Sequence, residues 1–226
     1  MGSNSVKTLN TAVLSGFMEL LPAQQLVFDH MRAVIARCYG LYGFTPLDTP
    51  VIERAEVLLA KAGGETEKQI YQFRKGDHEL ALRFDLTVPL ARYVSEHLSD
   101  LTFPFRRYQI GKVYRGERPQ KGRFREFYQC DIDIIGRNEL SLVNDAEILC
   151  VIYTTFCELG LENVTIRLNN RKLLNGLFGE IGVDAAAVLR VVDKLEKIGK
   201  EAVCLELAGL GVAQEKAQRL VSFLQI

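Results

Sequence analysis

The stretch Arg107–Gly136 limits the possible folds of this chain more than any other. In its second half two sets of side chains alternate: Tyr128, Cys130, Ile132 and Ile134 interleave with Phe127, Gln129, Asp131 and Asp133. Such period-two alternation is typical of a half-buried β-strand, with one packed face and one open face. A loop containing Gly and Pro joins this strand to the preceding one. We therefore predict an antiparallel hairpin within an α+β fold.

The same stretch is basic, although the chain as a whole is balanced. Residues 106–126 hold eight Lys or Arg and two Glu. The 226-residue chain has a formal net charge of zero and a sequence pI of about 6.8. A balanced global charge does not steer a protein to nucleic acid or to a membrane. Any affinity for anions must therefore come from this hairpin.

Composition narrows the class of protein. With 48% hydrophobic residues, the chain can bury the core of one domain and a small attachment. The five cysteines include no Cys-x-x-Cys pair and the three histidines are scattered, so no zinc site is expected. Dispersed cysteines are typical of a reducing cytosol, and no apolar run approaches the ~20 residues of a membrane span. We expect a soluble, cytoplasmic protein.

Hydrophobic periodicity predicts three regions. We expect residues 1–15 to be an N-terminal extension able to be disordered, 16–170 to form an α+β core, and 171–226 to form a small all-helical module. In the core, the predicted helices are Ala23–Tyr39, Arg54–Ala62, Pro89–His97 and Leu140–Leu159, and the predicted extended segments are Phe44–Ile52, Ile70–Phe73, Leu80–Val88 and Val164–Leu168. The helical patterns of the module are Leu173–Ile181, Ala185–Ile198, Glu201–Ala208 and Ala213–Leu224.

The predicted strand Leu80–Val88 also has two distinct faces. One carries Leu80, Leu82, Phe84, Leu86 and Val88, and the other carries Ala81, Arg83, Asp85 and Thr87. If this strand and the hairpin share one antiparallel sheet, their polar faces form a floor with Asp85, Thr87, Arg115, Gln129 and Asp133. An arginine clamps a carboxylate or phosphate, while carboxylates hold cationic groups. The set complements a small zwitterion with an additional basic group.

A purely structural interpretation of these charges is also open. Charged residues on an exposed sheet face usually pair with one another in water and contribute only ~0–1 kcal/mol. For any one of the five residues this is the simpler explanation. Five chemically matched residues on neighbouring strands favour a binding site.

The loop Gly116–Arg125 allows two interpretations. Its basic residues Arg118, Lys121, Arg123 and Arg125 could bind phosphates of a nucleotide and of an RNA end, or could simply keep a turn solvated. Phe127 follows the loop on the predicted polar face. An aromatic side chain beside arginines is suited to stacking on a base, although a Phe packed at the edge of the core is the alternative.

These residues resemble a known family. Val113–Glu117 and Gly122–Asp133 resemble the second signature motif of class II aminoacyl-tRNA synthetases, in its histidyl-tRNA synthetase form. Leu82–Arg92 is similar to that family's histidine-binding segment, in the variant typical of eukaryotic-type enzymes. Tyr42–Pro50 resembles the first motif, which implies a homodimer interface around Phe44–Pro50. Gly16–Pro22 and Asn169–Gly176 are similar to the N-terminal segment, with Glu19 where Asp is usual, and to the start of the helical insertion.

The resemblance implies a class II synthetase-like antiparallel sheet flanked by helices, and a role for each matched position. Arg115 would be the catalytic residue that bridges the histidine carboxylate and the ATP α-phosphate. The implied histidine-binding residues are Asp85 and Thr87 at the α-ammonium, Gln129, and Asp133 at the imidazole. The implied ATP-binding residues are Glu117 and Phe127 at adenine and Arg123 or Arg125 at the outer phosphates. Mg²⁺ would accompany ATP, with Glu117 as a candidate ligand, and Arg118 and Lys121 would meet the acceptor end of tRNA(His).

The implied reaction is activation of histidine to histidyl-adenylate, followed by transfer to tRNA(His). The family's third motif and anticodon-binding domain do not follow the helical module, so we expect a fragment that is poorly active alone. Two alternatives remain. One is the histidine-sensing, synthetase-like regulatory subunit of ATP phosphoribosyltransferase, and the other is a fragment used only for dimerisation or as a scaffold. Retention of Glu117, the basic loop and Phe127 favours the synthetase.

Overall fold

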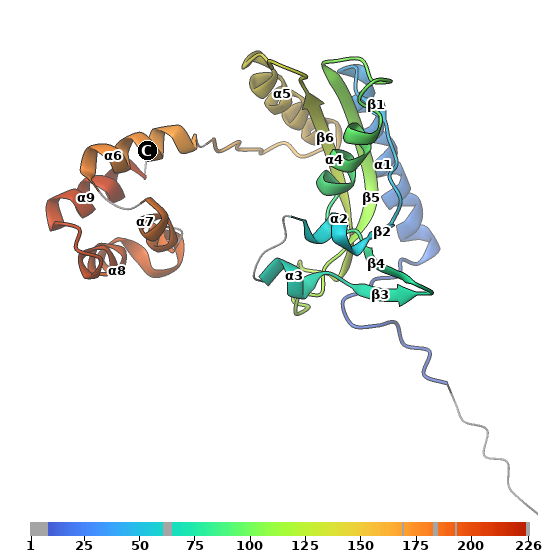
Figure 1. Ribbon diagram of the computed structural model, residues 1–226, viewed down its shortest axis with the longest axis horizontal. Helices are drawn as coiled ribbons and strands as arrows, with labels where there is room; N and C mark the ends of the chain where they lie inside the picture. Colours follow the sequence, from blue (N-terminus) through green and yellow to red (C-terminus); the bar gives the residue numbers. More distant parts are fainter. Residues whose placement is uncertain (1–8, 61–64, 169, 183–184, 193, 225–226) are drawn as a thin grey trace, which may run out of the picture. The chain divides into compact units, whose positions relative to one another are not determined.

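The computed structural model describes residues 9–60, 65–168, 170–182, 185–192 and 194–224 (Figure 1). The chain divides into two compact units, Met1–Ile166 and Arg167–Ile226. Separate hydrophobic clusters lie in each unit. The polar residues singled out above all belong to the first unit.

The first unit mixes helices with two three-stranded sheets, which confirms the predicted α+β class. One sheet has the order β1-β5-β6 and the other β2-β4-β3. β1 pairs with β5 in parallel, and the other pairs are antiparallel. The helices are α1 Pro22–Leu41, α2 Ala55–Leu59, α3 Glu65–Gln69, α4 Thr87–Glu96 and α5 Val143–Glu158, and the strands are β1 Thr45–Pro46, β2 Ile52–Arg54, β3 Gln72–Lys75, β4 His78–Leu82, β5 Phe105–Tyr114 and β6 Glu126–Ile135.

The long hairpin β5–β6 is the predicted central hairpin. Its register pairs Arg107 with Asp133, Gln109 with Asp131, Gly111 with Gln129 and Val113 with Phe127. Opposite residues of an antiparallel pair point to the same side of the sheet, so these residues share one face. The two alternating sets of β6 side chains therefore lie on opposite faces, as predicted. The polar face is not open, however: every residue of β6 is half-buried, and Arg107, Gln109, Gly111 and Val113 of β5 on that face are buried.

The other face of the hairpin is packed against helices. Figure 1 shows α1 running beside this hairpin, and α1 and α5 also contact each other. Buried Tyr39, Phe44 and Val151 gather there with apolar residues of both strands, which are Tyr108, Cys130, Ile132 and Ile134. Helix α1 begins at Pro22, whose missing N–H is not needed in a first turn, and extends the predicted helix Ala23–Tyr39 slightly at both ends.

The predicted strand Leu80–Val88 is only partly correct. β4 ends at Leu82, and Thr87 already begins α4. Arg83 is buried rather than on an open face, because its guanidinium finds backbone carbonyl partners inside the unit. The expected strand therefore becomes an irregular segment, residues 83–86, that we call the crossing segment.

The supposed sheet shared by this strand and the hairpin is also wrong, because β4 pairs with β2 and β3. The two sheets nevertheless meet, since the Tyr114 N–H donates to the Arg83 carbonyl over 3.0 Å and the Arg83 N–H donates to the Val51 carbonyl over 2.9 Å. The crossing segment is thereby held at the end of β5. It brings Asp85 to the polar face by a different route from the one predicted.

The predicted strand Val164–Leu168 does not form. Residues 161–168 are neither helix nor strand, and no ladder partner is present for them among the described residues. Alternation in the sequence indicates that the two faces of an extended segment differ in polarity. A β-strand also needs a neighbouring strand whose backbone groups pair with its own N–H and C=O groups.

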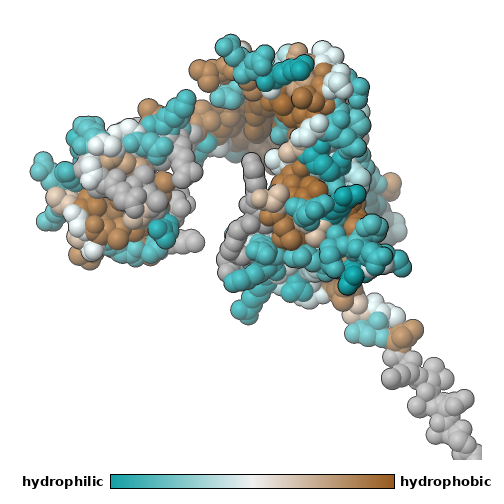
Figure 2. All heavy atoms as spheres, in the orientation of Figure 1, coloured by the Kyte–Doolittle hydropathy of each residue, from teal (hydrophilic) through white to brown (hydrophobic). Residues whose placement is uncertain are grey.

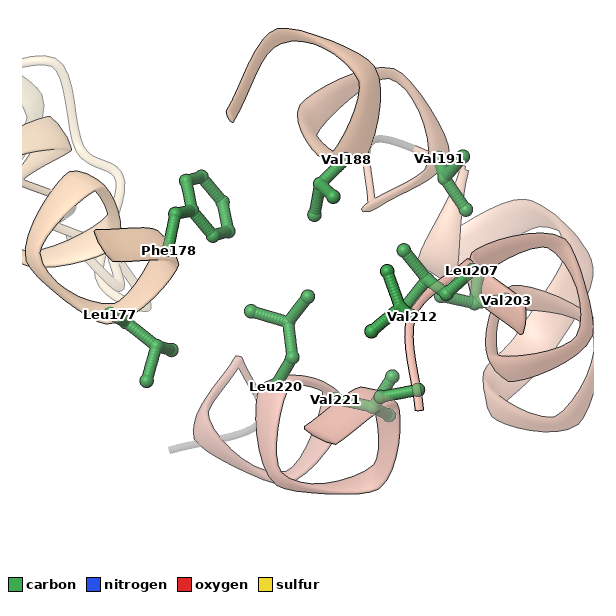
Figure 3. Packing of buried hydrophobic residues seen from close by; sticks show 10 residues of the cluster. Leu177, Phe178, Val188, Val191, Val203, Leu207, Val212, Leu220 and Val221 are labelled. Atoms are coloured by element: carbon green, nitrogen blue, oxygen red, sulfur yellow. The ribbon is translucent and has the colours of Figure 1, made fainter. Parts of the chain in front are cut away.

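The second unit consists of α6 Arg171–Ile181, α7 Ala185–Val192, α8 Leu195–Gly209 and α9 Gln214–Phe223. The predicted segment Ala185–Ile198 is divided between α7 and α8, and Gly199 interrupts α8 with a φ of +81°. Figure 3 shows side chains from all four helices pointing toward one another, and the cluster contains Leu177, Phe178, Val188, Val191, Val203, Leu207, Val212, Ala217, Leu220 and Val221. Four short amphipathic helices thus bury one common core.

The surface mixes apolar and hydrophilic side chains, as the face in Figure 2 shows. Large exposed apolar residues include Leu26 and Val27 of α1 and Leu142 and Val143 around the start of α5. Across the described residues, no helix combines the length and apolar character needed to cross a bilayer.

Candidate functional site

The candidate site lies on the polar face of the β5–β6 hairpin, where the crossing segment passes over it. Gly111 makes this close approach possible, because a Cβ at that position would stand 2.5 Å from Nη2 of Arg83. The Arg83 guanidinium donates to the carbonyls of Lys112 and Thr49 over 2.7 and 2.6 Å. These bonds fix the crossing segment against the hairpin.

Asp85 caps the start of α4 from the crossing segment. Its Oδ1 accepts hydrogen bonds from the backbone N–H groups of Thr87 and Val88, at 3.1 and 2.9 Å. N–H groups in the first turn of a helix have no intrahelical partner, so a carboxylate there satisfies them. Asp85 and Thr87 are thus adjacent, as predicted for the site, but Thr87 lies exposed on a helix instead of on a strand.

Arg115 joins the two parts of the site. Its Nε donates to the Phe84 carbonyl over 3.2 Å. Its guanidinium carbon lies 4.5 Å from the centre of the Phe84 ring and 5.1 Å from that of Phe127. Guanidinium groups are attracted to aromatic faces at such distances. Arg115 is therefore held between the crossing segment and the start of β6.

A cluster of opposite charges occupies the same face. Burial raises the pKa of Asp131; Arg107 and Arg115 lower it, and Asp133 and Asp85 raise it. Burial also raises the pKa of Asp133, against the effect of Arg107. Three carboxylates and two guanidinium groups therefore act on one another here. Such a set can hold both a cationic and an anionic group of one ligand.

Arg107 was not singled out for the site by the sequence analysis, although its side chain is fully buried, at 0% exposure. Its Nη2 lies 2.6 Å from Oδ2 of Asp133 and donates to the Leu86 carbonyl over 3.3 Å. Burial lowers the pKa of Arg107, and Asp133 and Asp131 raise it. The sequence did contain a signal for Arg107. This arginine is separated from Gln109 and Gly111 by steps of two residues, so along a strand it lies on the same face as they do. Asp131, placed on the polar face but outside the predicted site, was missed in the same way.

Gln129 lies on β6 between Phe127 and Asp131, opposite Gly111. Its Oε1 is buried and has no hydrogen-bond partner among the described residues. A buried acceptor without a donor is uncommon in proteins, because it loses its hydration without replacement. Gln129 can therefore accept a hydrogen bond from a ligand.

A cavity adjoins Arg115 on the loop side. Its volume is about 360 Å³, and its lining consists of Arg115, Glu117, Gly122, Arg123, Phe124 and Phe127. Nη1 of Arg123 lies 3.3 Å from Oε2 of Glu117. The structure thus groups four of the five residues predicted to bind a nucleotide, and it adds Phe124, which the sequence analysis did not single out.

Arg125, the fifth predicted nucleotide-binding residue, does not line this cavity. Its Nε donates to the Glu117 carbonyl over 3.1 Å and its Nη1 to the Ser15 carbonyl over 3.4 Å. Its backbone N–H donates to the Gly16 carbonyl over 2.7 Å. Arg125 therefore attaches the N-terminal segment to the loop. Arg118 and Lys121 lie exposed in the loop.

No group of three or more His, Cys, Asp or Glu suited to a metal ion occurs in the part of the chain that the structure describes. All five cysteines are free thiols.

The candidate site consists of an acidic and arginine-rich floor on the hairpin, an aromatic and basic cavity on the loop side, and Arg115 between them.

Comparison with known proteins identifies a family with these features. The Histidyl-tRNA synthetase family matches residues 16–226. The histidine–tRNA ligase of Clostridium tetani is 62% identical over 216 residues, which are 95% of this chain and 49% of that protein. That of Xanthomonas oryzae pv. oryzae is 51% identical over 235 residues, covering 93% of this chain and 50% of that protein.

Solved structures agree. The histidyl-tRNA synthetase of Nostoc sp. PCC 7120 superposes with a TM-score of 0.87 at 42% identity, covering 97% of this chain and 49% of that one. An ATP phosphoribosyltransferase regulatory subunit/histidyl-tRNA synthetase from Bacillus halodurans shares the fold, with a TM-score of 0.80 at 22% identity over 97% of this chain and 56% of that one. The chain spans about half the length of the curated relatives it matches. It belongs to the histidyl-tRNA synthetase family, with the α+β fold of a class II synthetase.

Proposed function

We propose that the first unit binds L-histidine on the polar face of the β5–β6 hairpin and ATP in the adjoining cavity, as the substrate-binding half of a histidine–tRNA ligase. The position of Arg115 carries this proposal. It stands between an acidic floor and an aromatic, basic cavity, where one guanidinium can contact the carboxylate of an amino acid and a phosphate of a nucleotide.

The floor suits histidine. Asp85, with Thr87 beside it, would hold the α-ammonium group, and Arg115 would hold the α-carboxylate. Asp133 would accept a hydrogen bond from the imidazole. The unsatisfied Oε1 of Gln129 supports this assignment, since the ligand's N–H groups would supply the missing donor.

The cavity suits ATP. Phe127 would stack on adenine beside Glu117, and Arg123 would meet the outer phosphates, with Arg125 holding the loop in place. Mg²⁺ usually binds proteins through one or two carboxylates together with substrate phosphates and water. The single carboxylate of Glu117 fits this pattern, and the ion would neutralise phosphate charge when ATP is bound.

Catalysis by these residues would consist mainly of positioning and charge neutralisation. Arg115 would align the histidine carboxylate with the α-phosphorus, where attack forms histidyl-adenylate and releases pyrophosphate. Arg118 and Lys121, exposed in the loop, would meet the acceptor end of tRNA(His) through its phosphates.

We further propose a homodimer that uses the segment Phe44–Pro50 and acts in the cytoplasm. Phe44 and Thr49 anchor this segment inside the first unit, while Thr45, Pro46 and Asp48 between them are exposed. The five free thiols support a reducing compartment. Sedimentation velocity tests the dimer: a single species near 25.4 kDa across micromolar concentrations would contradict it.

Separate calorimetric titrations with L-histidine and with ATP–Mg²⁺ test the proposal on this chain. We expect both ligands to bind. Binding of histidine without ATP would favour a histidine sensor, and binding of neither would favour a scaffold. Either result would contradict the synthetase function, as would equal affinity for histidine and for alanine, which lacks the imidazole ring.

A further inference from the structure

Arg107 is a buried charge to which the proposed roles above assign no task. We infer that Arg107 neutralises Asp133, so that the site accepts the uncharged imidazole ring of histidine and discriminates against the protonated ring. Arg107 is thus a positioning and specificity-determining residue that acts through Asp133. The inference rests on the proposed histidine site and goes beyond it, because it specifies which ionic form of the substrate binds.

The geometry places the arginine behind the carboxylate. Arg107 has no exposed surface, whereas the side chain of Asp133 remains 29% exposed. Nη2 of Arg107 lies 2.6 Å from Oδ2 of Asp133, and the same nitrogen donates to the Leu86 carbonyl in the crossing segment. A ligand can therefore reach Asp133 from the open side without contacting Arg107.

The charged groups that act on Asp131 and Asp133 come from three places. Arg107 lies in β5 and Arg115 directly after it, Asp131 and Asp133 lie in β6, and Asp85 lies in the crossing segment. The α-ammonium of histidine would occupy Asp85, and its α-carboxylate would occupy Arg115. Arg107 would then remain for Asp133, the carboxylate that the ring contacts. This ion pair has zero net charge, and Asp131 beside it leaves the remaining group with one negative charge. Without Arg107, the ring would face two carboxylates, which favour a cation.

The incomplete hydrogen bonding of Arg107 supports a role at a binding site. Its Nε and Nη1 are buried and have no hydrogen-bond partner among the described residues. Buried charged donors without partners lower stability, so a residue selected only for cohesion would be expected to have them satisfied. Groups that lower the stability of a protein and are nevertheless retained are often required for its function.

Proton release on histidine binding provides the test. At pH 6 roughly three-quarters of free imidazole rings are protonated. Calorimetric titration at pH 6 in two buffers of different ionisation enthalpy should therefore show about 0.7 proton released per histidine bound, and the affinity should fall as the pH decreases below ~6.5. For Arg107→Met we expect little release and tighter binding at pH 5.5 than at pH 8. Arg107→Lys keeps the charge and should release protons as the natural chain does.

Arg106→Met is the matched control. Arg106 neighbours Arg107 in β5 but faces the opposite side, where its Nη2 lies 2.8 Å from Oε1 of Glu147. This variant loses an arginine from the same strand, and we expect the proton release of the natural chain. The same change in proton release in both methionine variants would overturn the inference.

Two further results would overturn it. The first is histidine binding by the unsubstituted chain without proton release at pH 6, a result that needs no variant and stands even if Arg107→Met does not fold. The second is an Arg107→Met chain that binds histidine more weakly at every pH but releases the usual number of protons, because Arg107 would then act only on structure. A complete lack of histidine binding by the unsubstituted chain is a different outcome, since it contradicts the proposed function itself.

Discussion

Arg83 and Arg107 are two buried arginines on the same side of the β5–β6 hairpin, and their surroundings differ. Arg83, 3% exposed, donates to the Lys112 and Thr49 carbonyls and pairs with Asp48. Arg107, 0% exposed, contacts Asp133 and the Leu86 carbonyl, and two of its nitrogens lack partners among the described residues.

The partners of the two arginines indicate different roles, one in holding the fold together and one in the proposed binding site. Arg83 connects the end of β4, the segment before β2 and the hairpin through backbone carbonyls, so its charge serves the fold. Arg107 is directed at a carboxylate that a ligand can reach. Equal burial of two identical side chains therefore says little about their roles; the identity and completeness of their partners are more informative.

The largest effect on stability is expected from Arg83→Met. The substitution removes the donors of the buried Thr49 carbonyl and of the partly buried Lys112 carbonyl. An unsatisfied carbonyl costs about 1–3 kcal/mol, so we expect a loss of about 3 kcal/mol in the free energy of unfolding. Arg107→Met should cost clearly less, because Nε and Nη1 of Arg107 already lack hydrogen-bond partners among the described residues. All eight tyrosines lie in the first unit and the chain has no Trp, so urea denaturation followed by tyrosine fluorescence reports on that unit. Equal losses in the two variants would remove the distinction.

Asp133→Ala should separate the two halves of the proposed site. We expect histidine affinity to fall about 10- to 100-fold, because a charged hydrogen-bond acceptor and the partner of Arg107 are both lost, and ATP affinity to change less than threefold. Glu147→Ala on the opposite face is the control. Calorimetry with each ligand measures both effects, and equal loss of the two affinities would argue against the assignment.

Gly111→Ala probes the fit between Arg83 and the hairpin. The added methyl group would stand 2.5 Å from Nη2 of Arg83, so either the guanidinium or the strand must move. We expect a loss of about 1–3 kcal/mol in the free energy of unfolding, together with weaker histidine binding. Gly40→Ala in α1 is the matched control, since nothing lies within 4 Å of its added methyl group; it should stabilise by about 0.5–1 kcal/mol. Similar effects of the two substitutions would show that the crossing segment is not held tightly.

The smallest expected effect is a dependence of stability on pH. Burial raises the pKa of Asp131 and of Asp133, so the folded chain binds protons more tightly than the unfolded chain does. Their contribution is present at low pH and is lost as the pH rises from the ordinary value of 3.8 through the raised pKa values. Asp131→Asn should therefore flatten this decline and raise the free energy of unfolding at pH 7. Asp77→Asn, which removes an exposed carboxylate from the β3–β4 turn, is the matched control. A decline equally steep in Asp131→Asn and in this control would refute the prediction.

The hairpin was predictable because period-two alternation needs only local information. The pairing of β4 was not, since alternation gives the faces of a strand but not its neighbours, and Arg83 found partners in residues far along the chain. The same limit explains Val164–Leu168, where a β-like pattern has no ladder partner among the described residues. Motif residues such as Arg115, Asp85 and Phe127 were identified from sequence. Arg107 and Asp131 became candidates only when the register and burial were known.

The position of β6 in its sheet has a practical consequence. This ten-residue strand pairs with β5 on one side, and no ladder joins its other edge to any described residue. Open edges of this length can recruit another extended chain and seed aggregation. Charged side chains such as Asp131 and Asp133 disfavour stacking of identical edges, and acid would weaken this protection by protonating them. Storage of this polypeptide at neutral pH and low concentration should therefore keep it dispersed better than storage in acid.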